Sequence, residues 1–183
     1  MQRINAVNPA EAIGKAKQLL AGVQAKLGIT PNLMKTLAQS PAALDAYLHF
    51  SGSLSTGVLD AKFRELLAVA VAQANSCEYC LSAHTAIGGM VGLSADELSI
   101  AREARSEDAK RDAGLQFAQK IVVQRGTVTD QDFAVVREAG YNDAEITEIV
   151  AHVGLNIFTN YFNNIVKTEV DFPLVSVELA AAK

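Results

Sequence analysis

Aromatic side chains are scarce in this sequence. They make up 6% of its 183 residues, and tryptophan is absent. Half of the residues are apolar, and alanine, leucine and valine dominate among them. Small aliphatic side chains in this proportion favour close-packed helices over a β-sandwich, and the length suits one domain with a substantial core. We therefore expect an all-α fold in a single domain that spans residues 1–183.

Long apolar runs and clusters of basic residues are also lacking. No run approaches the roughly 20 apolar residues of a membrane span, and the first residues lack the basic and apolar regions of a signal peptide. The net charge is −4, and residues of both signs are mixed along the chain, so no basic stripe indicates a nucleic-acid site. We expect a cytoplasmic protein that binds neither membrane nor nucleic acid.

Only two cysteines occur, Cys77 and Cys80, in the stretch NSCEYCLSAH that also contains His84. A structural disulfide does not persist in the cytoplasm, so a CxxC pair there favours redox or metal chemistry. On a helix, residues three and four apart share a face, which would align both thiols with the imidazole. At this point a redox couple, a set of zinc ligands and an ordinary helix end all remain open.

About eight to nine helices are expected from residues that commonly begin a helix. Two of these starts are capping boxes, Ser94 with Glu97 and Asn142 with Glu145. The last and longest helix should run from Asn142 to about Val166. The expected starts are Asn8, Thr30, Ser40, Asp60, Ser76, Ser94, Ser106, Thr129 and Asn142.

These helices divide the single domain into four parts. Residues 1–58 should form lead-in helices, 59–93 a helical hairpin around the CxxC pair, 94–170 the C-terminal helices, and 171–183 an extended tail packed on a neighbouring chain.

The last helix carries apolar residues on most of its sides, and such a helix must be buried on most of its sides. Because a small domain rarely hides that much apolar surface, we expect a homo-oligomer.

A weak internal echo links the helix that contains Glu65 with the last helix. When the two are aligned, Glu65 falls on Glu148, and the two cysteines fall, at the same offset, on Asn160 and Asn163. A duplicated helical unit that kept its chemistry in one copy would produce this pattern. Two unrelated alanine-rich helices with good caps would produce it as well, so both explanations stay open.

Glu65 belongs to the helix that precedes the cysteines. At about 1.5 Å per residue, it lies roughly 15 Å before the turn, and His84 lies roughly 12 Å after it. If the two helices fold back antiparallel, the carboxylate and the imidazole stand at the same level. A helix N-terminus stabilises a thiolate, so Cys80 could be a nucleophile whose proton passes to His84, with Glu65 orienting the imidazole. Cys77 could then attack an oxidised Cys80 and close a disulfide.

Zinc binding is an alternative, because catalytic zinc sites use three protein ligands. The two cysteines and His84 lie close together on one helix face, which is an unusual ligand set, and the sequence has no second CxxC. Glu65 taken alone could be a solvated acid paired with Lys62 or Arg64.

Three further side chains have structural as well as functional explanations. Tyr79 either fills the core or forms a pocket wall, with an accessory role in the site open. His49 and His152 suit packed helices without catalytic duty. His152 is the stronger accessory candidate, because its helix echoes the one that carries Glu65.

Glu65, Cys77, Cys80 and His84 reproduce the spacing E-x11-C-x-x-C-x3-H. This pattern resembles the alkylhydroperoxidase D (AhpD) family of the carboxymuconolactone decarboxylase-like superfamily. The segments TPNLMKTLAQSPAALDAYLHF and GLNIFTNYFNNIV are similar to the lead-in and closing helices of its peroxidase-related branch. The resemblance implies an AhpD-like multihelical fold, a trimer-based assembly, and peroxidase activity that uses the CxxC pair.

Carried onto this chain, the resemblance implies that Cys80 is the peroxidatic thiol and Cys77 the resolving one, with His84 and Glu65 as the proton relay. The best-studied members have a further histidine where this chain has Tyr79, which leaves the end of the relay open. Decarboxylase relatives generally lack the cysteine pair, so we do not expect lactone decarboxylation.

The sequence therefore predicts an antioxidant oxidoreductase that reduces alkyl or hydrogen peroxides through a Cys77–Cys80 dithiol/disulfide cycle. No cofactor or metal is expected, and an external dithiol, either lipoyl-bound or thioredoxin-like, must supply the electrons. A trimer or hexamer is favoured over a dimer. Two other functions stay open: a disulfide reductase or thiol adaptor for a separate peroxidase, and a non-catalytic redox-sensing or zinc-binding helical module.

Overall fold

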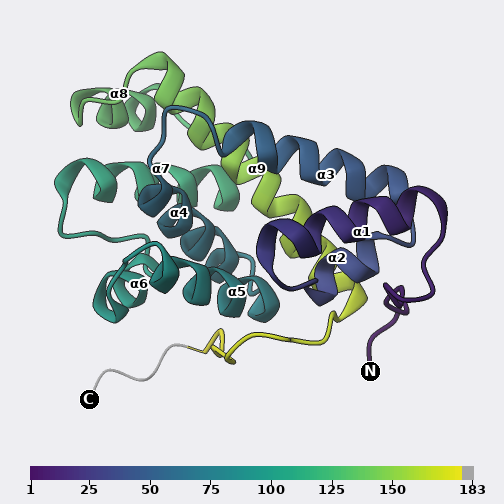
Figure 1. The fold of residues 1–183 in the computed structure, drawn as a ribbon. Helices are drawn as coiled ribbons and strands as arrows, with labels where there is room; N and C mark the ends of the chain where they lie inside the picture. The colour runs from purple at the N-terminus through teal and green to yellow at the C-terminus, as the bar shows by residue number, and fades with distance from the viewer. Residues whose placement is uncertain (179–183) are drawn as a thin grey trace.

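The computed structural model of the protein describes residues 1–178. Within that range the chain forms nine α-helices and no β-strand, which confirms the expected all-α fold (Figure 1). The helices are α1 (Gly14–Leu27), α2 (Asn32–Leu37), α3 (Pro41–Leu54), α4 (Ala61–Ala74), α5 (Glu78–Met90), α6 (Ala95–Ala101), α7 (Ala109–Val123), α8 (Asp130–Glu138) and α9 (Asp143–Val166). None of these helices is long and apolar enough to cross a membrane.

Five of the expected helix starts are confirmed by capping bonds. The Ser40 hydroxyl accepts a hydrogen bond from the Ala43 amide at the start of α3, and the Asp60 carboxylate accepts one from the Phe63 amide at the start of α4. Complete capping boxes begin α6, α8 and α9, and α9 ends at Val166 as expected. These bonds satisfy amide groups that the first turn of a helix leaves without a partner.

Two other expected starts are wrong because the side chains close local turns instead. Asn8 Oδ1 accepts a hydrogen bond from the Ala10 amide, so a turn forms there and α1 begins only at Gly14. The Ser106 hydroxyl accepts a hydrogen bond from the Asp108 amide, and Asp108 takes over as the N-cap of α7.

The expected starts at Thr30 and Ser76 are also displaced. The Thr30 hydroxyl donates to Gln24 Oε1 of α1, and α2 begins after Pro31 without a side-chain cap. Ser76 adopts the left-handed conformation, with a φ of 51°, which no helix residue can keep. The next residue, Cys77, becomes the N-cap of α5.

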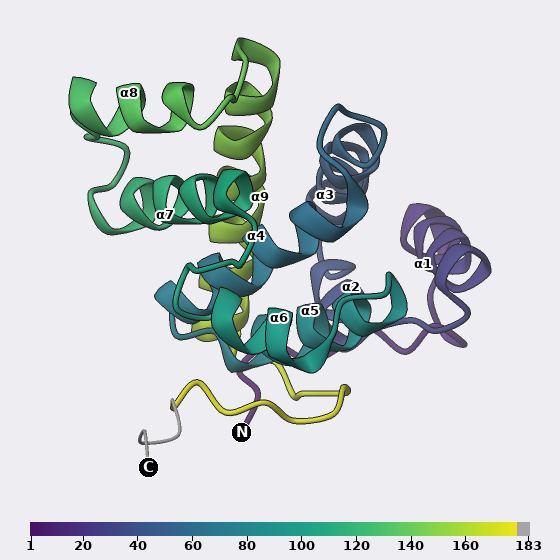
Figure 2. The same cartoon turned by 90° about the vertical axis from the view of Figure 1, so that its left-hand side faces the viewer.

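The central element of the fold is α4, which packs against α5, α6, α7 and α9. Its residues 66–72 are all buried, and every one of them is leucine, alanine or valine. Figure 2 shows α1 and α3 on one side of this centre and α7 and α8 on the other. A helix that is buried on all of its sides requires a sequence that is apolar on all of its sides, and this stretch of α4 has one.

The last helix does not repeat the hairpin that α4 and α5 form. The chain turns between Ala74 and Glu78, whereas α9 continues without a break from Asp143 to Val166. The positions of α9 that align with the two cysteines therefore lie inside a helix. The internal echo in the sequence corresponds to one helix and not to a second hairpin.

The described part of the tail, residues 171–178, packs on its own chain. The Val175 amide donates to the Ser82 hydroxyl of α5, and the Arg102 guanidinium donates to the Ser176 carbonyl. Packing of the tail on a neighbouring chain stays a prediction. The remaining tail residues lie outside the described range.

Candidate active site

The hairpin of α4 and α5 brings a carboxylate and an imidazole together. Glu65 Oε2 of α4 lies 2.7 Å from His84 Nδ1 of α5. The two side chains are 18% and 25% exposed, so water only partly screens their interaction. Glu65 is therefore the partner of His84 and not of Lys62 or Arg64, as the antiparallel arrangement of the two helices required.

Cys77 lies just before α5, as its N-cap, and not in the first helical turn as the sequence suggested. Its Sγ accepts a hydrogen bond from the Cys80 amide at 3.3 Å. The left-handed turn at Ser76 directs the Cys77 amide back to the carbonyl of Ala72, the position where α4 ends its buried run. Both thiols are free and buried at the N-terminal end of α5, where the helix dipole stabilises negative charge.

Cys80 is buried, and yet its thiol is acidic. Burial raises its pKa, but hydrogen bonds from Cys77 and Asn163 and the positive charge of His84 outweigh burial and lower the pKa to about 7. The Asn163 bond comes from α9, where Nδ2 donates to Cys80 Sγ at 3.2 Å. A thiol with this pKa is substantially ionised at neutral pH, and the thiolate is the nucleophilic form.

The pKa of the other thiol, Cys77, shifts in the opposite direction. Its hydrogen bond to Cys80 and its burial raise the pKa of Cys77 well above the usual value for a thiol. Cys77 therefore keeps its proton and donates it toward the Cys80 sulfur. The two cysteines form an asymmetric pair with one thiolate and one thiol. Burial alone would not produce this difference, because both cysteines are buried.

His84 is the cationic partner of this thiolate. Burial lowers its pKa, while the charge and hydrogen bond of Glu65 and the negative charge of Cys80 raise it, and the net shift is upward. Because Nδ1 faces Glu65, the other ring nitrogen remains available to hold a proton. The site can therefore store a proton on the imidazole beside an ionised sulfur.

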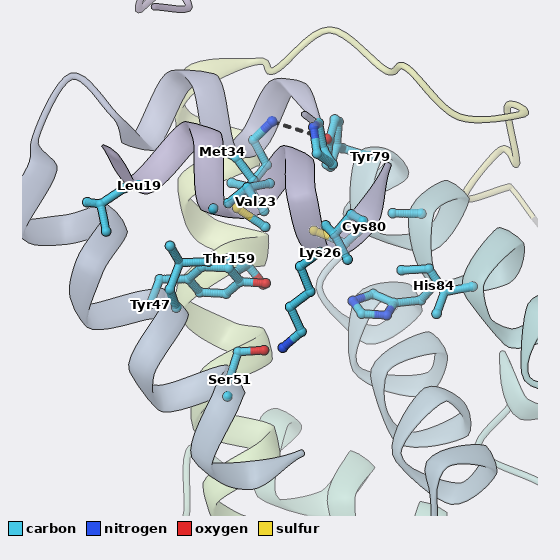
Figure 3. A pocket seen from close by; sticks show the side chains of 18 of the residues that line it. Leu19, Val23, Lys26, Met34, Tyr47, Ser51, Tyr79, Cys80, His84 and Thr159 are labelled. Carbon is cyan, nitrogen blue, oxygen red and sulfur yellow. Dashed lines mark hydrogen bonds between the residues drawn. The ribbon is translucent and has the colours of Figure 1, made fainter. Parts of the chain in front are cut away.

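A cavity of about 450 Å³ lies in front of Cys80 and His84 (Figure 3). Figure 3 shows the Cys80 sulfur and the His84 ring pointing into it from α5, opposite Tyr47 of α3. Cavities of roughly 300–1,000 Å³ with mainly apolar walls are typical of small-molecule sites. Most of the walls here are apolar and come from α1, α2, α3, α5 and the tail, with side chains such as Leu19, Val23, Met34, Leu48, Ile87 and Phe172.

The residues of this site lie in a segment that matches a known family. Residues 41–119, which contain Glu65, both cysteines and His84, match the carboxymuconolactone decarboxylase (CMD) family. The whole fold is also similar, with a TM-score of 0.81, to the alkylhydroperoxidase AhpD core structure of an uncharacterized peroxidase-related protein from Ralstonia eutropha. That similarity covers 93% of this chain and 92% of the other, at 28% sequence identity. The match over residues 41–119 and the similarity of the whole fold support the AhpD/CMD-like superfamily for this chain.

Two further proteins are similar to this chain. An uncharacterized peroxidase-related protein from a Silicibacter species has a TM-score of 0.81 and 25% identity, over 92% of this chain and 91% of the other. A protein from Haemophilus influenzae is 51% identical over 47 residues, which are 25% of this chain and 42% of that protein. The chain thus spans less than half of that curated relative. The names of the structural relatives support a peroxidase-related, antioxidant role at this coarse level.

Tyr79, which stands where the best-studied AhpD relatives have a histidine, is a wall of the cavity. Its hydroxyl accepts a hydrogen bond from the Leu33 amide at 3.1 Å, and its ring meets Phe172 edge-on with the centroids 5.8 Å apart. Burial raises the pKa of Tyr79 far above that of an ordinary phenol, so the hydroxyl stays protonated. Tyr79 therefore connects α5 to α2 and the tail, and both explanations apply, since the side chain is buried in the core and also lines the cavity.

Neither of the two remaining histidines lines the cavity. His152 is buried in α9, and burial lowers its pKa, so it is neutral at pH 7. Its Nε2 has no hydrogen-bond partner among the described residues, and it does not line the cavity. His49 was expected in a packed helix but is exposed on α3, where its Nδ1 pairs with the Asp45 carbonyl. An accessory role for His152 gains no support from these positions.

The zinc alternative gains no support from the donor geometry. Within residues 1–178, no three histidine, cysteine, aspartate or glutamate side chains are placed to share one metal ion. Cys77 Sγ is engaged as the helix cap, and His84 Nδ1 is engaged with Glu65. The motif residues form two separate hydrogen-bonded pairs, Glu65 with His84 and Cys77 with Cys80.

Three residues complete the site without having been anticipated as site residues: Asn163, Tyr47 and Lys26. Asn163 bonds to the Cys80 sulfur, and the other two line the cavity in front of it. The internal echo had aligned Asn163 with Cys80, which was a usable clue. Tyr47 and Lys26 lie in the lead-in helices, and no local pattern distinguished them from other residues there.

Proposed function

We propose that this protein is a thiol-dependent hydroperoxide reductase in which Cys77 and Cys80 alternate between a dithiol and a disulfide. The observation that carries the proposal is the asymmetry of the two thiols. One has a pKa lowered to about 7, lies beside an imidazole whose pKa is raised and faces an organic-sized cavity, while the other keeps its proton. The peroxidase-related names of the structural relatives support the same function.

In the first step, the Cys80 thiolate attacks one oxygen of the hydroperoxide, and the O–O bond breaks. Cys80 becomes a sulfenic acid, and the departing alkoxide takes a proton from His84 and leaves as an alcohol. Glu65 holds the ring through Nδ1 and stabilises its charge, so that the proton is available on the side that faces the cavity. The peroxide gains two electrons, and the sulfur loses them.

In the second step, Cys77 attacks the Cys80 sulfur, a disulfide forms, and the sulfenic oxygen leaves as water. The hydrogen bond to the Cys80 thiolate is the largest cause that raises the pKa of Cys77. Oxidation of Cys80 removes that thiolate, so the resolving thiol becomes easier to ionise only after the first step. This order protects Cys77 from premature reaction and Cys80 from further oxidation.

The cycle closes when an external dithiol reduces the disulfide. Cys77 is 0% exposed and Cys80 is 3% exposed, but Cys80 borders the cavity. A reductant must therefore reach the Cys80 sulfur through the cavity. A slender lipoyl-type dithiol fits this path better than a folded thioredoxin-like protein, whose own cysteine must come into contact with the sulfur that it attacks.

Steady-state kinetics with cumene hydroperoxide and dihydrolipoamide tests the proposal, with Cys80→Ser as the inactive control. Formation of cumyl alcohol in equal amount to oxidised lipoamide supports the peroxidase. Reduction of glutathione disulfide by dihydrolipoamide, without peroxide turnover, would instead support a thiol adaptor for a separate peroxidase. Loss of both reactions would leave a redox-sensing module.

Assembly into a homo-oligomer is part of the proposal and rests on α9. Four large side chains of this helix are between 43% and 64% exposed: Val150, Phe158, Tyr161 and Ile165. Exposed apolar residues gathered on one helix commonly mark a protein interface. A second copy of the chain would cover them, and a trimer-based assembly would follow the AhpD-like pattern.

A further inference from the structure

The lining of the cavity in front of Cys80 includes one ammonium group, that of Lys26, which has no carboxylate partner within residues 1–178. Apart from the thiol, its ionisable lining residues with a formal charge at neutral pH are Lys26, Glu65 and His84. Glu65 and His84 pair with each other at 2.7 Å. Lys26 forms no ion pair with any residue in the described range 1–178. The ammonium group of Lys26 is therefore free to pair with a ligand.

Hydrogen-bond donors gather around this charge. Figure 3 shows the Lys26 side chain reaching from α1 across the cavity toward Ser51 of α3, and the hydroxyl of Tyr47 pointing into the same space. Burial raises the pKa of Tyr47 to about 12, so its phenol keeps a proton to donate. An ammonium and two hydroxyls that converge on one place form a suitable environment for a carboxylate or a similar anion.

The rest of the cavity is apolar. Its apolar lining residues include Leu19 and Val23 of α1, Leu48 of α3 and Ile87 of α5. Hydrogen peroxide would gain nothing from such walls, because it has no apolar surface to bury. The volume of about 450 Å³ suits a molecule with a hydrocarbon body.

We propose that the cavity binds an amphipathic organic hydroperoxide whose anionic group, such as a carboxylate, pairs with Lys26 while its peroxide group lies at Cys80. The position of the peroxide group at Cys80 rests on the proposed function, whereas the binding of the anionic group by Lys26 does not depend on it. Chain-bearing carboxylic acid hydroperoxides are the substrate class that meets both requirements.

Binding can be tested without turnover by using octanoate and octan-1-ol as unreactive probes. Either probe, when bound, should slow the alkylation of Cys80 by iodoacetamide, which peptide mass spectrometry measures separately from Cys77. We expect octanoate to protect at a concentration roughly two- to fivefold lower than octanol, which is the range for a partly exposed ion pair. Lys26→Gln should remove this difference and Lys26→Arg should retain it.

Lys17→Gln is the matched control, because Lys17 lies on the same helix and lines a different surface hollow. It removes the same charge from α1 and should leave the preference for octanoate unchanged. Equal protection by the two probes, a preference that survives Lys26→Gln, or no protection by either would each overturn the proposal.

Kinetics with linoleic acid hydroperoxide and its methyl ester then separates the inference from the proposed function. Wild type should reduce the acid with a kcat/KM roughly two- to fivefold above that of the ester, and Lys26→Gln should bring the ratio to about one. An unchanged ratio in Lys26→Gln would overturn the substrate inference while leaving a peroxidase. If wild type reduces neither compound but octanoate still protects Cys80, the proposed function fails while the anion site stands.

Discussion

Asn163 of α9 donates a hydrogen bond from Nδ2 to the Cys80 sulfur at 3.2 Å, although the two residues are 83 positions apart in the sequence. The contact is buried on both sides, with Asn163 3% exposed and Cys80 3% exposed. A neutral donor in this position stabilises the thiolate without competing with its negative charge. The reactivity of the nucleophile therefore depends on the packing of α9 against α5 as well as on the local CxxC sequence.

Replacing this donor should make Cys80 less acidic. Asn163→Asp removes the amide and places a negative charge beside the sulfur, so the pKa of Cys80 should rise from about 7 by one unit or more. The pH dependence of alkylation of Cys80 by iodoacetamide measures this pKa directly. Asn164→Asp is the control, since it adds the same charge one position away, where Nδ2 bonds to the Asn75 carbonyl. A pKa that moves equally in both variants would show that the hydrogen bond is unimportant.

The two cysteines should respond differently to substitution. Cys80→Ser should abolish peroxide consumption, because it removes the thiolate. Cys77→Ser should allow a single turnover and then accumulate a sulfenic acid on Cys80, which a dimedone label detects by mass spectrometry. If Cys80→Ser retained the first turnover instead, the assignment of the two roles would be reversed.

His84 should contribute through proton transfer. His84→Gln should lower kcat/KM at neutral pH on the order of 10²–10⁴-fold, and Glu65→Gln should lower it less, because Glu65 acts only through the ring. His49→Gln provides the matched control, since His49 is exposed on α3 and does not line the cavity. Changes below about threefold at both His84 and Glu65, with folding intact by circular dichroism, would remove the relay from the mechanism.

The pH profile should be bell-shaped, with Cys80 and His84 responsible for its two limbs. The rate should rise as the pH increases through about 7, where the Cys80 thiolate forms, and fall at higher pH as His84 loses its proton. The charge of Glu65 is the largest cause that raises the pKa of His84. Glu65→Gln should therefore move the alkaline limb to lower pH and narrow the bell. An alkaline limb that does not move would show that another group controls it.

The exposed face of α9 should be covered in solution. Multi-angle light scattering at micromolar concentration should give a mass above the 19.4 kDa of one chain, with a trimer or hexamer expected. Phe158→Glu would place a charge on this face, where the ring is 43% exposed in the single chain, and should shift the mass toward the monomer. A monodisperse wild-type monomer would contradict the proposed assembly.

Local interactions made several features of this protein predictable from its sequence. The starts of α3, α4, α6, α8 and α9 follow from caps in which a side chain bonds to an amide three residues away. The Glu65–His84 contact could also be anticipated, because a short turn leaves two adjacent helices little choice but to pack antiparallel. Where a cap residue had a nearer partner, as Asn8 and Ser106 did, the same local reasoning misplaced the helix start.

Tertiary packing alone decided what surrounds the thiols. The apolar pattern of α9 predicts that most of its sides are buried, but it does not specify which helix covers each side. Only the fold could therefore place Asn163 on Cys80. The cavity likewise forms only because α1 and α3 lie opposite α5. Only this arrangement brings Lys26 and Tyr47 into the lining of the cavity. The motif therefore determined which atoms react. The contacts between distant helices determined how acidic the sulfur is and what can reach it, because burial and charge depend on neighbours in space.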